Sequence, residues 1–276
     1  MKIDIHNEFY FDVEIEVRDF RNETYSVNVK KTEENNGEVI YSLAGENKFL
    51  IAGKVVQKNY KDSIGLYVDF GCKKNDNWEI LHCFDAYKSL TLKLRPSHDK
   101  VNVFCDEFWR APETDCWARA SFCDSLTDIP KSVSNMLWKY NDFYFNMVPI
   151  SDGDFKTTLK GGENCIELVM SANMGGYTHI MGTVAVLSFG KDPFKTFEDT
   201  VATGYKMLGR RVKTESDRKL PEMFDYLGWC SWDGFGREVT EQGLYEKAKE
   251  IADKEIPVRW MLIDDGWFPY EDEMLK

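Results

Sequence analysis

The sequence has little positive charge and only short apolar runs, which argues against a nucleic-acid-binding protein and against a transmembrane protein. Its 276 residues contain 35 Lys and Arg against 47 Asp and Glu, which gives a formal net charge of −12. Nucleic acids and anionic membranes need a basic face, so we expect neither as a partner. No window approaches the ~20 consecutive apolar residues of a transmembrane helix. Residues 1–6 lack the apolar core of a signal peptide.

The cysteines and histidines show no spacing typical of metal ligands. The seven cysteines are an odd number, are scattered along the chain and include no Cys-x-x-Cys pair. The four histidines cluster neither with one another nor with the cysteines. We therefore expect reduced thiols in a cytoplasmic protein and no metal site.

Most of the chain has the pattern of short strands. Apolar and acidic residues alternate from Phe11 to Val17, which indicates a strand with one wet face, and Asn36-Gly37 is typical of a hairpin turn. The pattern predicts an antiparallel β-sandwich over residues 1–208. The other strands are expected at residues 25–29, 39–43, 49–56, 64–70, 78–84, 89–94, 101–109, 116–122, 140–149, 155–159, 165–171 and 178–189.

A helix is predicted at about residues 193–208, where Pro193 suits the first turn. Its apolar residues recur at spacings of three and four and predict one stripe on the helix: Phe194, Phe197, Val201, Tyr205 and Leu208. The charged residues 209–223 follow and are expected to be a linker between two domains.

Residues 224–276 predict a strand, a helix and a second strand parallel to the first. Leu227-Gly-Trp-Cys-Ser-Trp-Asp233 and Met261-Leu-Ile-Asp-Asp-Gly-Trp267 are apolar runs that end in polar and aromatic residues. The strands are expected at 224–231 and 258–263, the second buried on both faces. Thr240 can cap the helix between them, and its predicted buried stripe is Leu244, Ala248, Ile251 and Ala252. Such a βαβ unit requires a right-handed crossover.

Carboxylates and indoles gather where these two strands end, which is where α/β units place their chemistry. Asp264 and Asp265 can share a site only if the strand ends there, because adjacent strand residues point to opposite faces. Gly266 supplies the turn. An ionised carboxylate can accept hydrogen bonds from two sugar hydroxyls. The residues alone leave a second interpretation equally open, in which Asp264 caps a plain Asp-Gly turn.

One earlier segment, Glu107-Phe-Trp-Arg-Ala-Pro112, also departs from the composition of a scaffold. Trp109 and Arg110 could cover a sugar with a stacking ring and a hydrogen-bonding fork. The alternative is an ordinary end of a strand.

The residues that end both strands also carry a family resemblance. Gly228-Trp-Cys-Ser-Trp-Asp233, followed by Ile263-Asp-Asp-Gly-Trp-Phe268, resembles glycoside hydrolase family 36, in its raffinose synthase and seed imbibition protein branch, and is similar to the α-galactosidases of that family. Asp152-Gly-Asp-Phe155, Asp192-Pro-Phe194 and Leu220-Pro221 are weaker matches in the same order. The resemblance covers about residues 81–268.

This resemblance implies an N-terminal β-sandwich followed by a (β/α)8 barrel that cleaves or transfers α-linked galactose with retention, without a metal or organic cofactor. It implies an α-galactoside oligosaccharide as partner and allows a homo-oligomer. It implies that Asp264 and Asp265 bind galactose hydroxyls and that tryptophans line the sugar subsite. The expected binding residues are Asp264, Asp265, Trp229, Trp232 and Trp267, with Asp233, Trp109 and Arg110 as weaker candidates.

The length of the last segment departs from the family pattern. A (β/α)8 barrel needs ~250 residues, and about 50 follow the linker. A retaining glycosidase needs a nucleophile and an acid/base, and no residue of this chain matches either role. We therefore expect the N-terminal part of an enzyme, inactive by itself and prone to self-association. The alternatives are a related retaining α-glycosidase, acting for example on α-N-acetylgalactosamine, or a non-catalytic carbohydrate-binding or assembly module.

Overall fold

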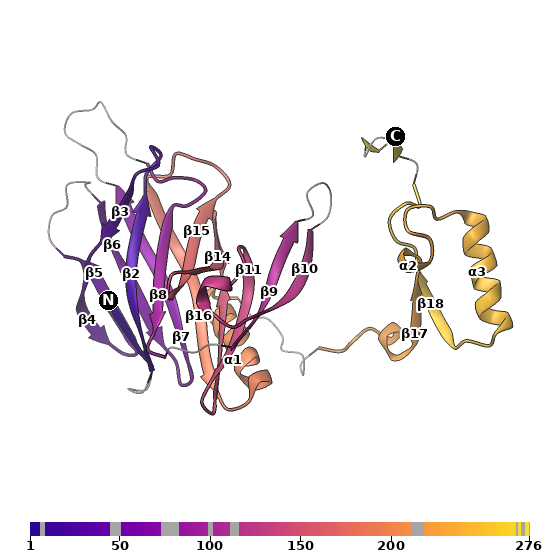
Figure 1. Cartoon of the computed structure of the whole chain (residues 1–276), viewed down its shortest axis with the longest axis horizontal. Coiled ribbons are helices and arrows are strands. Elements are labelled where there is room, and N and C mark those ends of the chain that lie inside the picture. The colour runs from indigo at the N-terminus through magenta and orange to yellow at the C-terminus, as the bar shows by residue number, and fades with distance from the viewer. Residues whose placement is uncertain are drawn as a thin grey trace. The chain divides into compact units, whose positions relative to one another are not determined.

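The chain forms two compact units, Met1–Val212 and Lys213–Lys276, in a computed structural model (Figure 1). The structure describes residues 1–5, 9–44, 51–72, 83–98, 102–110, 116–210, 218–268, 270–271 and 274–275. The predicted linker lies partly outside these residues and stays a prediction.

The first unit is one antiparallel sheet of sixteen strands with a helix after the last strand. Its main path runs β1-β2-β8-β15-β14-β11-β12-β16-β7-β6-β5-β4. The bounds are β1 (Lys2–Ile5), β2 (Phe9–Arg18), β3 (Thr24–Val27), β4 (Val29–Asn35), β5 (Glu38–Leu43), β6 (Ile51–Asn59), β7 (Ser63–Cys72), β8 (Leu90–Pro96), β9 (Asn102–Arg110), β10 (Cys116–Cys123), η1 (Leu126–Asp128), β11 (Val133–Tyr140), β12 (Phe143–Pro149), β13 (Ser151–Asp152), β14 (Phe155–Gly162), β15 (Cys165–Ala172), β16 (His179–Gly190) and α1 (Pro193–Met207).

Side-chain alternation explains which face of β2 is inside. Phe11, Val13 and Ile15 are buried while the acidic residues between them are more exposed, as a strand with period two requires. The predicted turn at Asn36-Gly37 joins β4 to β5, and both residues have positive φ angles of 45° and 84°. Left-handed φ at both central residues matches the type I′ turn that asparagine and glycine favour.

The sheet curls on itself, so that two parts of it face each other across the core. Phe9 of β2 meets Phe145 of β12 with ring centroids 5.1 Å apart, and Phe11 meets Trp138 of β11 at 6.4 Å. Strand β11 joins the two parts, because it pairs with both β14 and β12. The prediction of antiparallel strands around one core is confirmed, but the expected sandwich is a single continuous sheet.

Helix α1 lies where the sequence predicts a helix, and it buries a face of small residues. Its buried residues are Thr196, Thr200, Thr203 and Gly204. Phe194 and Phe197 of the predicted apolar stripe are 81% and 44% exposed. Small side chains let the helix lie close to the sheet: a Cβ added to Gly204 would stand 3.2 Å from Ile150 Cδ1. The apolar spacing thus located the helix, while its small residues form the buried face.

This orientation of α1 gives a first prediction. Thr200 is fully buried and its hydroxyl donates to the Thr196 carbonyl oxygen at 2.8 Å. Thr200→Leu should destabilise the chain by about 1–3 kcal/mol through overpacking. Phe194→Ser should change stability by no more than ~0.5 kcal/mol. Chemical denaturation of both variants checks this, and the reverse order of effects would contradict the observed orientation.

The second unit contains the predicted pair of parallel strands. Its elements are η3 (Glu222–Asp225), β17 (Leu227–Cys230), α2 (Trp232–Phe235), α3 (Glu241–Asp253), β18 (Val258–Leu262), β19 (Tyr270–Glu271) and β20 (Met274–Leu275). Strand β17 pairs in parallel with β18, and α3 connects them. The first strand begins at Leu227 instead of residue 224, because the preceding residues form a 3-10 turn. The (β/α)8 barrel remains an expectation.

Burial in this unit differs from the prediction. Helix α3 has no buried residue, although Thr240 caps it as expected by accepting from the Gly243 N–H at 3.1 Å. Strand β18 was predicted to be buried on both faces, yet Met261 and Leu262 are 37% and 46% exposed. The physical reason is that a two-stranded sheet with one helix has too few elements to cover both faces of a strand.

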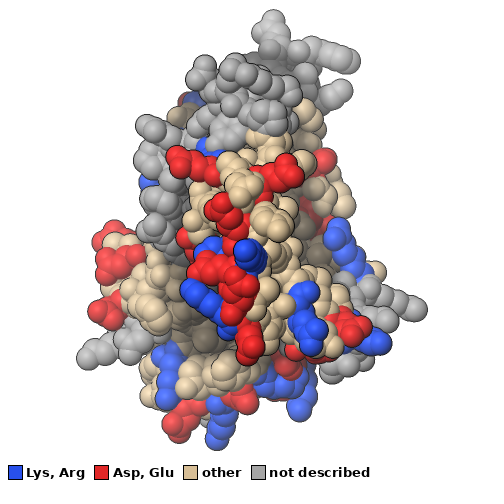
Figure 2. Space-filling model, turned by 90° about the vertical axis from the view of Figure 1, so that its right-hand side faces the viewer, with Lys and Arg blue, Asp and Glu red and all other residues tan. Residues whose placement is uncertain are grey.

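Helix α3 carries an exposed ion-pair network around Glu250. The carboxylate meets Lys247, three residues before it, and Lys254 Nζ at 2.6 Å, four residues after it. Hydrogen bonds from these two lysines, supported by their charges, lower the pKa of Glu250 to about 2. Figure 2 shows one face of the molecule, on which acidic and basic side chains lie next to one another.

The lowered pKa of Glu250 gives a prediction for α3. Because the folded value lies below the unfolded value of about 4.3, the ion pairs stabilise the helix above about pH 4.3 and lose this effect as the pH falls towards 2. We expect the helical 13Cα shifts of α3 to decline over that window. In Glu250→Gln the decline should be smaller. Equal declines in both proteins would contradict the role of this network.

Candidate functional site

The candidate site begins where β17 and β18 end side by side. Cys230 pairs with Leu262 as the last residue of each strand. Ser231 follows, is fully buried, and donates its N–H to the Leu262 carbonyl oxygen at 3.0 Å. Its hydroxyl oxygen accepts from the Asp264 N–H at 2.9 Å. The chain after β18 is therefore fixed to the chain after β17.

Asp264 lies directly beside the end of β17. The Cys230 thiol donates to Asp264 Oδ2 at 3.4 Å, and the Asp265 N–H donates to Asp264 Oδ1 at 2.7 Å. Asp264 is half-buried, and Cys230 is exposed. A thiol is a weak donor, so Asp264 Oδ2 keeps most of its capacity to accept further hydrogen bonds.

Asp265 is bound to a different part of the loop after β17. Its Oδ2 lies 2.9 Å from Arg237 Nε, and its Oδ1 accepts from the Gly266 N–H at 2.8 Å. Gly266 has a φ of 98°, and a Cβ at this position would stand 2.5 Å from the Arg237 carbonyl oxygen. Only glycine fits such a left-handed turn against another backbone, which explains the Asp-Asp-Gly order.

The three tryptophans predicted for the site lie in different surroundings. Trp229 of β17 is half-buried and meets Phe235 edge to face at 6.0 Å. Trp232 is half-buried at the start of α2. Trp267 is 68% exposed and meets Phe268 edge to face at 5.1 Å. Asp233, the weaker candidate, is exposed in α2. The role of these four residues at a sugar stays a prediction.

The two weaker candidates of the first unit lie at the end of β9. Trp109 pairs with Trp117 and Arg110 with Cys116 of β10, so their backbone belongs to an antiparallel hairpin. Figure 1 shows this β9–β10 hairpin next to β11. The side chains of both residues lie outside the described part of the structure, and their role stays a prediction.

The weaker sequence matches in the first unit have structural roles. Asp192 caps α1 by accepting from the N–H groups of Phe194 and Lys195 at 2.9 and 3.1 Å. Asp152 Oδ2 accepts from the Thr183 N–H at 2.8 Å and so ties the β13–β14 hairpin to β16. Both carboxylates are thus bound to backbone N–H groups of the scaffold, and these contacts do not indicate a sugar site.

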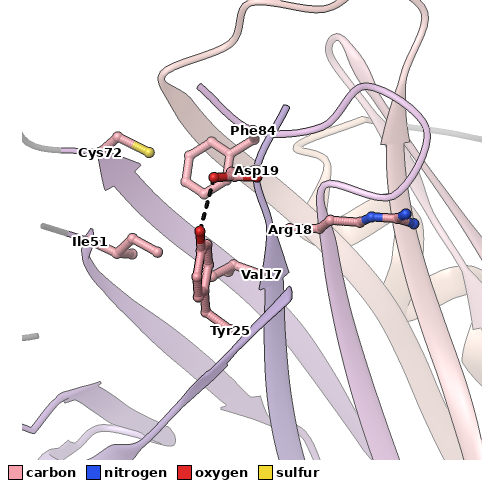
Figure 3. A pocket seen from close by; sticks show the side chains of 7 residues that line it. All are labelled: Val17, Arg18, Asp19, Tyr25, Ile51, Cys72 and Phe84. Carbon is pink, nitrogen blue, oxygen red and sulfur yellow. Dashed lines mark hydrogen bonds between the residues drawn. The ribbon is translucent and has the colours of Figure 1, made fainter. Parts of the chain in front are cut away.

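A small pocket in the first unit is too small for a sugar. Its volume of about 10 Å³ is about what one water needs. Figure 3 shows Tyr25 pointing towards Asp19, to which its hydroxyl donates at 3.0 Å, with Cys72 and Phe84 nearby. Burial, then the neighbouring Cys83 and Asp19, raises the pKa of the Cys72 thiol to about 11, so this thiol is protonated at neutral pH. The pocket is therefore part of the scaffold.

Within the described ranges, no three or more His, Cys, Asp and Glu side chains are placed to bind one metal ion. No helix in those ranges combines the length and apolar character needed to span a membrane.

In the described residues, the structure is mostly β: an antiparallel β unit is followed by a parallel strand–helix–strand unit. The model of the family described as raffinose synthase or seed imbibition protein Sip1 matches residues 125–274, more than half of the chain. The chain therefore belongs to this family, and the resemblance predicted from the residues at both strand ends is confirmed.

Individual relatives agree with this membership. Over 130 residues the chain is 32% identical to a probable galactinol–sucrose galactosyltransferase 6 of Arabidopsis thaliana, covering 45% of this chain and 17% of that protein. A galactinol–sucrose galactosyltransferase of Pisum sativum is 30% identical over 128 residues, covering 45% and 16%. The chain thus matches less than a fifth of the length of either relative.

A solved structure supports the fold. The GH36 α-galactosidase AgaA of Geobacillus stearothermophilus matches 96% of this chain and 42% of its own chain, with a TM-score of 0.50 and 11% sequence identity. At this identity the likeness concerns the fold alone. By name, the two plant relatives are galactosyltransferases.

Sequence reasoning missed the residues that hold the two acids. The sequence patterns indicate neither Arg237 nor the polar atoms of Cys230 and Ser231 as partners of these acids. The structure instead places their polar atoms on Asp264 and Asp265. The available signal is a polar residue directly after one strand, when a neighbouring strand ends in an acid. This signal does not identify which atoms of the two residues meet.

Proposed function

We propose that this chain is the N-terminal portion of a retaining enzyme that hydrolyses α-galactosides or transfers their galactose, and that the loops after β17 and β18 bind the terminal galactose. The observation that carries the proposal is the pair of acids after β18 and beside the end of β17: Asp264 is held by hydrogen bonds, and Asp265 by an ion pair and a hydrogen bond. Binding sites of α/β units form at this end of the strands.

The chemistry of a neutral hexose suits these side chains. Sugar hydroxyls are donors, and an ionised carboxylate accepts from them in charge-assisted hydrogen bonds. The apolar face of a galactose ring can pack on an indole. We assign binding roles to Asp264, Asp265, Trp229, Trp232 and Trp267, with Asp233, Trp109 and Arg110 as secondary contributors.

The reaction itself requires groups that these two acids do not supply. A retaining glycosidase uses two carboxyl groups ~5–5.5 Å apart on opposite sides of the scissile bond. Asp264 and Asp265 are consecutive residues of one turn, and each already accepts hydrogen bonds from its surroundings. Their proposed role is therefore to bind and orient galactose. In the proposed complete enzyme, the β17–α3–β18 unit begins a (β/α)8 barrel whose later strands carry the nucleophile and the acid/base.

The exposed apolar residues of the second unit support this arrangement. Leu227, Leu262 and Ile263 on or beside the two strands are 53%, 46% and 50% exposed. Additional barrel strands would pair with the open edges and additional helices would cover the faces. Such exposure also favours self-association of this chain when it is prepared by itself.

A comparison of two sugars tests the proposed function. Methyl α-galactoside and methyl α-glucoside differ only in the configuration at carbon 4. In amide NMR titrations of this chain, the galactoside should shift residues 230–237 and 262–268 with a dissociation constant in the range of ~1 mM, which corresponds to about −4 kcal/mol. The glucoside should bind more weakly. Equal shifts with both sugars, or shifts confined to the first unit, would contradict the proposal.

A chromogenic α-galactoside tests the proposed absence of catalysis in this chain. If the nucleophile and the acid/base lie outside it, the chain should release no aglycone beyond the uncatalysed rate. Turnover that is lost in Asp264→Asn would show that the chain holds a complete catalytic site, contrary to the proposed division of roles.

A further inference from the structure

The two neighbouring acids at the candidate site are not equivalent. The Asp265 carboxylate is paired with the Arg237 guanidinium at 2.9 Å. Among the residues that the structure describes, no basic side chain forms an ion pair with Asp264, whose Oδ2 meets only the Cys230 thiol at 3.4 Å. Within the described residues, one acid is thus paired with a cation, while the other has only a thiol beside its outer oxygen.

The guanidinium is suited to fix an acid in one orientation. It is planar and permanently charged, and its donors are held in a rigid fork. Asp265 Oδ2 forms the ion pair with Arg237 and Oδ1 accepts from the Gly266 N–H, so contacts at both oxygens orient its carboxylate. The positive charge of Arg237 also reduces the repulsion between two carboxylates that are adjacent in the chain.

The backbone of Arg237 reinforces this contact. Gly266 packs so closely against it that a Cβ would stand 2.5 Å from the carbonyl oxygen and 2.6 Å from the Cα of Arg237. The loop after β17 therefore meets the turn after β18 through both the side chain and the backbone of one residue. The position of the Asp264-Asp265 turn depends on Arg237.

We infer that Arg237 is a positioning residue of the sugar site, which fixes Asp265 and the turn so that Asp264 is the carboxylate that accepts from the hydroxyls of the bound hexose. This inference rests on the proposed function. Within the site assigned above, Asp264 is the main acceptor for the hexose hydroxyls, and Asp265 contributes chiefly by holding the turn together with Arg237.

Four variants separate these roles: Asp264→Asn, Asp265→Asn, Arg237→Gln and Arg237→Lys. Affinity is measured with methyl α-galactoside by NMR titration. Asp264→Asn should weaken binding about tenfold or more, the usual scale for a lost hydrogen bond to a charged group, with the amide shifts of the free protein unchanged beyond residues 262–266. Asp265→Asn and Arg237→Gln should weaken binding less, and Arg237→Lys should restore part of the loss.

A double variant tests whether Arg237 acts through Asp265. If it does, Asp265→Asn combined with Arg237→Gln should weaken binding no more than either change alone. Additive losses, or a greater loss in Asp265→Asn than in Asp264→Asn, would overturn the inference. If Arg237 only stabilised the fold, Arg237→Gln would lower the unfolding temperature, and Arg237→Lys would not restore part of the affinity.

A readout without sugar distinguishes failure of the inference from failure of the proposed function. Cys230 is exposed and contacts Asp264, so its alkylation by iodoacetamide, followed by peptide mass analysis, reports on the turn. Asp265→Asn and Arg237→Gln should change this rate by the same factor, and the double variant by no more. If the wild-type chain binds no sugar, the proposed function and the ligand role of Asp264 fail, whereas unequal, additive changes in alkylation would overturn the positioning role itself.

Discussion

Trp138→Ala is expected to destabilise the first unit by about 3–5 kcal/mol, the usual cost of deleting a buried large aromatic side chain. Trp138 is 1% exposed, and its ring stacks on Phe145 with centroids 5.3 Å apart. Its indole N–H also donates to His98 Nε2 at 3.0 Å. Because this ring lies where the two parts of the curled sheet meet, its loss leaves a cavity at the centre of the core.

The measurement is thermal unfolding of the first unit. For a unit of this size, the loss corresponds to a decrease in Tm of roughly 6–20 °C. Trp138→Phe keeps a ring and removes the hydrogen bond, so it should cost about 1–3 kcal/mol. Tyr87→Ala is a matched control, because Tyr87 is 86% exposed, and should shift stability by no more than ~0.5 kcal/mol. A similar Tm for Trp138→Ala and the control would contradict the observed core.

Gly228→Ala should disrupt the second unit. Gly228 pairs with Trp260 across the two parallel strands, and an added Cβ would stand 2.1 Å from Trp260 Cζ2. The indole cannot simply turn away, since its N–H donates to the Met223 carbonyl oxygen at 2.7 Å. We expect a loss of about 3 kcal/mol, the upper part of the range for overpacking, and with it the loss of the site at the strand ends.

Hydrogen exchange of the β17 and β18 amides measures this effect. Exchange in both strands should accelerate by about two orders of magnitude, because opening of the unit becomes about 3 kcal/mol easier, while the first unit remains protected. Gly175→Ala is a suitable control, since its new Cβ would meet only Ala86 Cβ at 4.0 Å. Unchanged exchange in Gly228→Ala would show that the close contact with Trp260 is not required.

Strand β2 is visible in the sequence because its apolar and acidic residues alternate regularly. Strand β11 was missed because its pairing with β9 shifts register between Val133 and Asn135, so its buried residues Val133, Met136 and Trp138 do not follow a period of two. The predicted strand at 140–149 begins later for a related reason: a turn with Asn141 at a φ of 53° separates β11 from β12.

Helix α1 shows a limit of a different kind. Its sequence contains both an apolar stripe and a face of threonine and glycine, and periodicity favours the apolar stripe. The choice between the faces depends on how closely the helix approaches the sheet, which the small residues Thr200 and Gly204 permit. The distance between the helix and the sheet cannot be predicted from the pattern of one sequence.

At the candidate site, the turn after β18 could be predicted but its partners could not. Asp264, Asp265 and Gly266 follow an apolar run, so the end of the strand was visible in the sequence. Arg237 reaches Asp265 from 28 positions earlier in the chain (265 − 237) through the path of an irregular loop. Loops of this kind are positioned by the elements they join and not by a local periodicity.

The most direct test of the account is a crystal structure of this chain with methyl α-galactoside bound. The account predicts a galactose ring at the ends of β17 and β18, with hydroxyl oxygens 2.5–3.0 Å from the Asp264 carboxylate and Asp265 still paired with Arg237. A galactoside bound to the first unit, or a ring at the strand ends that makes no hydrogen bond to Asp264, would contradict it.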